Sequence, residues 1–118
     1  MKVLLIEDDP ETIEAVRLCF EICRPDMTLV SARKGLEGIK LFQSQTPDVV
    51  MVDLGLDDMD GLEVIREIRR SSKVPILVVS ARSEPTVVPR VTALGANDFV
   101  VKPFHYQDLL ARLDNAMK

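Results

Sequence analysis

The sequence predicts an α/β fold in which helices cover both faces of a five-stranded parallel sheet. Short runs of apolar and β-branched residues alternate with longer segments whose apolar residues repeat at three and four, a pattern typical of consecutive β-α-β units. Each short run is almost continuously hydrophobic, as expected of strands covered on both sides. Polar residues directly follow several of these runs. The expected strands are Lys2–Ile6, Met27–Val30, Val49–Val52, Ile76–Val79 and Phe99–Val101.

Between these runs, the first helix has the clearest signals at both ends. Asp9 can cap it, Pro10 suits its first turn, and Pro25 ends it. A second helix ends before Pro47, and a third follows Gly61. The apolar positions that mark these three helices and the last one are Ile13, Val16, Cys19, Phe20 and Cys23; Leu36, Ile39 and Phe42; Leu62, Ile65 and Ile68; and Leu109, Leu110, Leu113 and Met117.

The segment between Ser83 and Leu94 is the weakest helix candidate. Pro85 and Pro89 lower its helix propensity, as do the β-branched residues between them. We therefore expect a short or distorted helix here.

Length and composition indicate one domain. The chain has 118 residues, of which 47% are hydrophobic and 29% charged, enough for one core and a polar surface. The first apolar run is too short for a membrane span and lacks a signal-peptide cleavage site, so we expect a cytoplasmic protein. The net charge of −4 argues against direct nucleic-acid binding by this segment. Cys19 and Cys23, one helical turn apart on an apolar stripe, indicate core thiols rather than a disulfide framework or a zinc site.

Polar residues gather at the carboxyl ends of the expected strands. Glu7 and Asp8 follow the first strand, Asp53 the third, Ser80 the fourth and Lys102 the fifth. In an open parallel sheet these ends share one edge, where ligands bind, so the five side chains should converge. Clustered acids repel each other unless a cation lies among them, and oxygen ligands favour Mg²⁺, for which Mn²⁺ can substitute. The sequence therefore predicts a magnesium site.

The same residues suit the transfer of a phosphoryl group. A carboxylate beside a bound cation can attack phosphorus, while the metal neutralises charge on the phosphoryl oxygens. Lys102 can supply a second positive charge, and Ser80 a hydroxyl group. Each residue alone has an ordinary explanation: Asp53 as a turn residue, Lys102 as a solvated side chain, Ser80 as a strand end. The prediction rests on their convergence.

Six segments also match, in order, the motifs of one known family. They are Lys2–Asp9, Pro47–Leu54, Met59–Glu63, Pro75–Arg82, Gly95–Phe99 and Lys102–Phe104. On these segments the chain resembles the receiver domain of two-component response regulators, most closely those of the winged-helix (OmpR-type) DNA-binding subfamily. The resemblance implies a flavodoxin-like (CheY-like), doubly wound fold with strand order 2-1-3-4-5 and five helices.

The resemblance also implies roles for the site residues. Asp53 would be the phosphoacceptor for a sensor histidine kinase, and Lys102, followed by a cis-proline bond, would contact the phosphoryl group. Ser80 and Phe99 would be the switch residues. The domain would assist its own phosphorylation without being a metabolic enzyme. The implied metal ligands are Glu7, Asp8, Asp53 and the backbone carbonyl of Gly55.

The chain departs from the family pattern at three places, all of which bear on output. Asp57 stands where proline is usual, which should loosen the loop after the phosphoacceptor; we expect it, Asp58 and Asp60 to be solvated rather than metal ligands. Asn97 replaces a common aspartate. The proline-containing segment 83–94 replaces a regular, charged helix.

These departures affect the predicted dimer face. Asp98, Asp108 and Arg112 match positions that carry interface charges in winged-helix regulators, but Val87 and Val88 lie where a basic residue is expected. We therefore predict at most a weak, phosphorylation-enhanced homodimer with a more apolar interface.

Three other functions fit the sequence less well than the receiver does. An aspartyl-phosphate phosphatase would carry a second acid two residues after its nucleophile and a cap domain, but Gly55 follows Asp53 here. A pseudo-receiver would lack an acid, Asp53 or Lys102, and all are present. Flavodoxin-like cofactor binding is disfavoured because there is no Gly-rich phosphate loop, no Trp and only Tyr106 as a tyrosine. We assign residues 1–118 to the receiver, and expect any output domain, with its DNA contacts, to follow Lys118.

Overall fold

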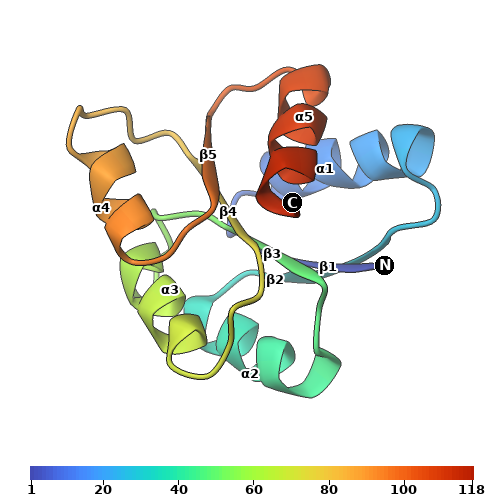
Figure 1. Cartoon of the computed structure of the whole chain (residues 1–118). Helices are drawn as coiled ribbons and strands as arrows, with labels where there is room; N and C mark the ends of the chain where they lie inside the picture. Colours follow the sequence, from blue (N-terminus) through green and yellow to red (C-terminus); the bar gives the residue numbers. More distant parts are fainter.

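The structure is a computed structural model of residues 1–118, in which a parallel sheet lies between two layers of helices (Figure 1). Its strands are β1 (Lys2–Ile6), β2 (Thr28–Ala32), β3 (Val49–Val52), β4 (Ile76–Ser80) and β5 (Asp98–Val101). Its helices are α1 (Pro10–Cys23), α2 (Gly35–Gln45), α3 (Gly61–Arg69), α4 (Val87–Ala93) and α5 (Tyr106–Ala116). The strand order β2-β1-β3-β4-β5 confirms the predicted topology.

Side chains alternate along the strands and build one core on each face of the sheet. In β1, Val3 and Leu5 pack with α1 and α5, whereas Leu4 and Ile6 pack with α3 and α4, with α2 against the same core. Figure 1 shows the same division, with α1 and α5 on one side of the strands and α2, α3 and α4 on the other. Both layers therefore hold the strands, and leave their carboxyl ends open at one edge.

Three strands differ slightly from the predicted bounds. β2 starts and ends later than expected because Thr28–Ala32 pairs in register with Lys2–Ile6 along its whole length. β4 extends to include Ser80, and β5 begins at Asp98. The expectation that every strand is buried is wrong for β2, where only Ala32 is buried, because this strand lies at the edge with one neighbour.

The start of α1 forms as the sequence predicts. The Asp9 carboxylate accepts hydrogen bonds from the Glu11 backbone N–H at 3.1 Å and the Thr12 hydroxyl at 2.8 Å, and Pro10 begins the helix. Further along, Cys19 is buried and burial raises the pKa of its thiol, while Cys23 is half-buried and both are free. The prediction of core thiols is confirmed for Cys19 and holds only in part for Cys23.

The fourth helix is short, as predicted, with seven residues and no side-chain cap. Pro89 lies in its first turn, where a missing N–H removes no bond within the helix. Val87 and Val91 face the core, whereas Val88 is exposed. The expectation that Val87 and Val88 both contribute to an apolar dimer interface is therefore wrong for Val87, because the first residue of α4 turns toward the sheet.

None of the helices combines the length and the apolar character that a membrane span requires.

Candidate functional site

The sheet brings the predicted site residues to one edge. β1 and β3 are neighbours, with Ile6 opposite Val52, and the Asp53 N–H continues the ladder by donating to the Ile6 carbonyl at 2.9 Å. β4 and β5 are paired likewise, and the Lys102 N–H donates to the Ser80 carbonyl at 2.9 Å. Each polar side chain thus leaves its strand at the same level, as the convergence rule for parallel sheets predicts.

Three carboxylates meet at this edge. Glu7, Asp8 and Asp53 each offer an oxygen, and these oxygens all lie within 4.8 Å of one another. Glu7 and Asp53 are buried, with 0% and 6% of their surfaces exposed, whereas Asp8 is partly exposed. The exposed Gly55 lies beside them, since a Cβ atom built on it would be 3.8 Å from Asp53 Oδ2. This set could hold one hard cation that is reached from solvent past Asp8.

Lys102 is the basic residue of this cluster. Its Nζ atom lies 2.5 Å from Glu7 Oε1 and 3.5 Å from Asp53 Oδ2, and its side chain is mostly buried. The bond between Lys102 and Pro103 is cis, as the family resemblance implies. The ammonium group of Lys102, which follows β5, therefore lies between Glu7 at the end of β1 and Asp53 at the end of β3.

The cluster has more negative than positive charge, and its pKa values reflect this. Burial, together with the Asp53 charge, raises the pKa of Glu7 to about 7 although Lys102 opposes the shift. Burial and Asp57 raise the pKa of Asp8. Burial disfavours the Lys102 cation, but pairing with Glu7 and Asp53 outweighs this and raises its pKa.

The buried Glu7 Oε1 atom accepts no hydrogen bond, so its contact with Lys102 is an ion pair without hydrogen-bond geometry. An under-coordinated buried oxygen among other carboxylates fits a divalent cation. The residues present therefore suit Mg²⁺.

Ser80 and Phe99 lie on the same face of the sheet, below α4. Ser80 shares the side of β4 that carries Ile76 and Val78, and those residues share a core with Phe99. Both side chains are buried, and the Ser80 hydroxyl accepts a hydrogen bond from the Arg82 N–H at 3.2 Å. The two predicted switch residues are thus on neighbouring strands, and Ser80 ends its strand at the cluster edge.

An open groove of about 400 Å³ borders the cluster where Lys102 reaches the surface. The residues lining it come from the start of α1 and the loops after β4 and β5: Asp9, Glu11, Thr12, Ala15, Ala81, Lys102, Pro103 and Phe104.

Two acids of the β3–α3 loop are exposed and lie outside the carboxylate cluster, as expected, but they also make capping bonds that the sequence did not predict. Asp58 accepts hydrogen bonds from the N–H groups of Gly35 and Leu36 at 2.8 and 3.1 Å, and Asp60 caps α3 by accepting from the Leu62 N–H at 2.9 Å. Helix N-termini attract carboxylates, and this accounts for both contacts. Neither acid belongs to the carboxylate cluster.

Comparison with known proteins agrees with the geometry of this edge. Residues 3–114 match the response regulator receiver domain. The chain belongs to this family. It is therefore a receiver domain of two-component response regulators, a regulatory rather than a metabolic protein, with the CheY-like fold.

Related proteins place this receiver domain near transcriptional regulators. It is 37% identical over 112 residues to the transcriptional regulatory protein KdpE of Staphylococcus aureus, covering 95% of this chain and 48% of the relative. It is 38% identical over 113 residues to the transcriptional regulatory protein AfsQ1 of Streptomyces coelicolor, covering 94% and 48%. The chain thus spans about half the length of these relatives. Their being transcriptional regulatory proteins is consistent with the winged-helix subfamily.

Solved structures show the same architecture. The beryllofluoride-activated N-terminal receiver domain of Klebsiella pneumoniae RstA superposes with a TM-score of 0.88 at 25% identity, over 100% of this chain and 99% of that one. The chemotaxis response regulator CheY4 of Vibrio cholerae superposes with a TM-score of 0.88 at 26% identity, over 98% and 97%.

Proposed function

We propose that Asp53 accepts a phosphoryl group from a phosphohistidine of a sensor histidine kinase, in a reaction that requires Mg²⁺ or Mn²⁺. The observation that carries this proposal is the meeting of three carboxylates within 4.8 Å, with Lys102 Nζ 3.5 Å from Asp53 Oδ2. Four separate strand ends supply these groups and the nearby Ser80, which is difficult to explain by helix capping or solvation alone.

The ligands for the cation would be Glu7, Asp8, Asp53 and the backbone carbonyl of Gly55. A cation held by these groups would lower the repulsion between the carboxylates and the incoming phosphoryl oxygens. The protein contributes the cluster itself, held by the β1 and β3 ladders.

In the transfer, one Asp53 carboxylate oxygen forms a bond to phosphorus. The bond between phosphorus and the histidine nitrogen breaks, and its electron pair stays on the imidazole. Lys102 moves its ion pair from the carboxylates to the phosphoryl oxygens, where the new negative charge lies. The groove beside Lys102 gives the donor histidine a route to the site.

The signal would leave the site through Ser80 and Phe99. The Ser80 hydroxyl accepts a bond from Arg82, so its own hydrogen is available to a phosphoryl oxygen. Its movement would change the packing under α4, where Phe99 lies. Because the relatives are transcriptional regulators about twice this length, we propose that a following output domain reads this change and controls transcription.

The proposal predicts that beryllofluoride and a small phosphodonor modify the wild-type domain only when Mg²⁺ or Mn²⁺ is present. Asp53→Asn removes the nucleophilic oxygen while keeping the shape of the side chain, so it should abolish the acid-labile adduct. Intact-mass spectrometry measures the adduct, and circular dichroism checks that the variant is folded. An acid-labile adduct of equal yield on the Asp53→Asn variant would contradict the assignment.

A further inference from the structure

The first turn of α2 is capped by a residue from a different loop. Lys34 is the residue before the helix, and its side chain makes no capping bond. Instead, the two oxygens of Asp58, in the β3–α3 loop, accept from the N–H groups of Gly35 and Leu36 at 2.8 and 3.1 Å. The helix therefore takes its cap from the loop that follows the phosphoacceptor.

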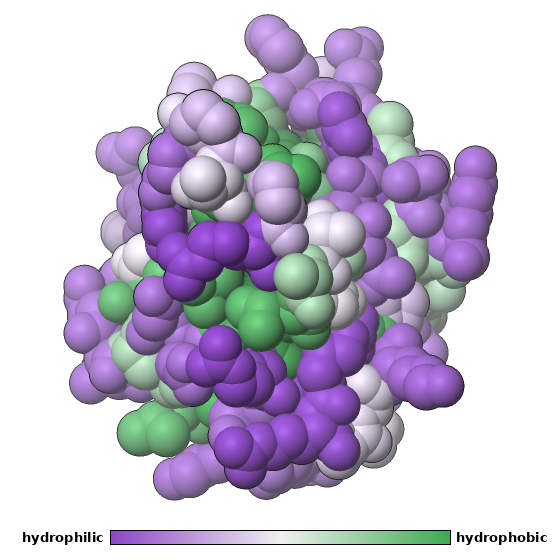
Figure 2. Space-filling view, turned by 60° about the vertical axis from the view of Figure 1, so that its left-hand side comes forward, coloured by the Kyte–Doolittle hydropathy of each residue, from purple (hydrophilic) through white to green (hydrophobic).

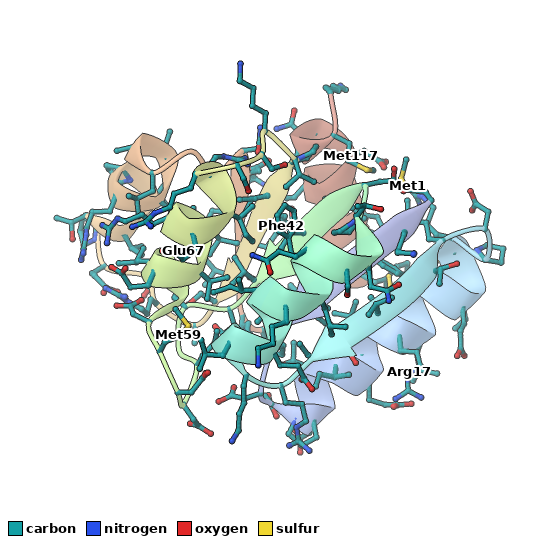
Figure 3. All side chains as sticks on the ribbon, turned by 90° about the horizontal axis from the view of Figure 1, so that it is seen from below. Met1, Arg17, Phe42, Met59, Glu67 and Met117 are labelled. Carbon is teal, nitrogen blue, oxygen red and sulfur yellow. The ribbon has the colours of Figure 1, made fainter.

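The surrounding contacts make this junction specific. The Met59 side chain lies against Gly35, where an added Cβ would come 2.7 Å from the Met59 sulfur, so a larger residue there would push the Met59 side chain aside. Figure 3 shows Met59 between the start of α3 and the first turn of α2. The capping bonds and this close packing join the loop to α2 at two successive residues.

Arg33, two residues before α2, contacts the loop that carries Asp8. The Arg33 guanidinium donates to the Asp8 backbone carbonyl at 3.2 Å, and the Arg33 N–H donates to Glu37 in α2 at 3.1 Å. The stretch from Arg33 to Leu36 thus contacts the segment that carries Asp8 and, through Asp58, the segment that carries Gly55. It therefore links the two loops that carry the proposed ligands Asp8 and Gly55.

Within the β3–α3 loop, Asp58 makes a contact with α2 that the neighbouring Asp57 does not make. Leu54 and Leu56 are buried, Asp60 caps α3, and the Gly61 N–H donates to the Leu54 carbonyl at 3.1 Å. Asp57, the residue just before Asp58, is exposed. The contact between Asp58 and α2 therefore holds the loop in place directly after an exposed residue.

We infer that Asp58 is a positioning residue for the metal site: by capping α2, it holds the β3–α3 loop in the conformation that presents Gly55 to the cation. Because the coupling is reciprocal, a cation at the carboxylates also strengthens the cap and orders the first turn of α2. A signal at Asp53 therefore reaches α2 as well as Ser80. This inference rests on the proposed metal site.

The test compares Mg²⁺ affinity by calorimetry in wild type, Asp58→Ala, Asp58→Asn and Asp48→Ala. Asp48 is the matched control, because its carboxylate also accepts a backbone N–H bond, from Lys2 at 2.7 Å, but it precedes β3 at the opposite edge of the sheet. Losing a cap of ordinary strength should weaken Mg²⁺ binding about fivefold in Asp58→Ala. Asp58→Asn keeps one acceptor oxygen and should lose less, and Asp48→Ala should bind as wild type.

Hydrogen exchange distinguishes a positioning role from a merely structural one, because only a positioning role makes amide exchange in α2 depend on Mg²⁺. Mg²⁺ should slow exchange of the Gly35 and Leu36 amides in wild type and in Asp48→Ala, and should have no effect on them in Asp58→Ala. If the Asn and Ala variants lose equal affinity and Mg²⁺ leaves both amides unchanged in wild type, only the charge of Asp58 matters and the inference is wrong. If wild type binds no Mg²⁺ at all, the proposed function itself fails.

Discussion

Glu7 is the residue whose state depends most on what occupies the site. Its carboxylate is fully buried, and Lys102 supplies the cation beside it. With a pKa of about 7, set first by burial, this group is about half protonated at neutral pH before any metal binds. At neutral pH a divalent cation must therefore displace, on average, about half a proton from Glu7.

Mg²⁺ affinity should consequently depend on pH in a defined direction. Between pH 8 and pH 6 the ionised fraction of a group of pKa about 7 falls about tenfold, so the affinity should fall about tenfold. The raised pKa of Asp8 acts in the same direction. Calorimetric titrations at several pH values measure the affinity, and buffers of different ionisation enthalpy count the proton released. Binding that is constant from pH 6 to pH 8, with no proton released, would show that Glu7 is ionised before the metal arrives.

At the scale of elements, the approach of α3 to β3 fixes where Asp53 lies. Gly61, the first residue of α3, packs against the backbone that carries Asp53 and Leu54. A Cβ atom on Gly61 would lie 2.6 Å from the Leu54 Cα, and closer still to the Asp53 carbonyl oxygen. Because neither backbone atom can move aside easily, the residue must be glycine for α3 to end the loop here.

Gly61→Ala should therefore destabilise the domain by about 1–3 kcal/mol, the usual cost of overpacking a well-packed site. Urea unfolding followed by circular dichroism measures the change. Gly55→Ala is the matched control from the same loop, because its Cβ would meet Asp53 Oδ2 at an ordinary 3.8 Å and should leave stability within about 0.5 kcal/mol of wild type. Equal losses in the two variants would mean that loop flexibility, not the close approach of α3, determines the effect.

Local signals predicted the elements well, because they act within a few residues. Asp9 and Pro10 start α1, and Pro85 and Pro89 limit α4 to a short helix, as expected. Predictions that depend on distant partners were less complete. The cap that Asp58 provides for α2 joins positions that are far apart in sequence, so no local pattern contains it.

The site likewise combines a feature that a general rule of sheet structure predicts with features that depend on individual side-chain contacts. The convergence of its residues was predictable, since it follows from the common edge of parallel strands. That Lys102 lies nearer to Glu7 than to Asp53 was not predictable, since side-chain packing decides it. Likewise, Asn97 accepts bonds from the Ile76 N–H at 2.9 Å and from Arg69 at 3.1 Å, a role that composition alone does not reveal.

For the whole molecule, the charges on the face formed by α4, β5 and α5 determine how two copies could meet. The charges predicted for this interface are already engaged within one chain: Arg112 lies 3.2 Å from Asp98 and 3.7 Å from Asp108. Figure 2, which brings the side with α4 forward, shows mostly hydrophilic surface interrupted by small apolar areas. Val88 and Val101 are each 46% exposed, whereas Val87 is buried. Charged pairs between copies would first have to break the pairs within each chain.

We therefore predict a weak dimer that beryllofluoride strengthens and that depends more on the exposed valines than on Arg112. Exposed ion pairs contribute only about 0–1 kcal/mol, and exchanging an internal pair for an intermolecular one gains less still. Burying the valines gains about 25 cal/mol for each Å² of apolar surface removed from water. Sedimentation velocity with and without beryllofluoride measures association in wild type, in the double variant Val88→Ser and Val101→Ser, and in Arg112→Gln. The valine variant should lose the activated dimer and Arg112→Gln should keep most of it. A tight activated dimer that survives in the valine variant but disappears in Arg112→Gln would show instead that Arg112 leaves Asp98 and Asp108 to pair across the two-fold axis.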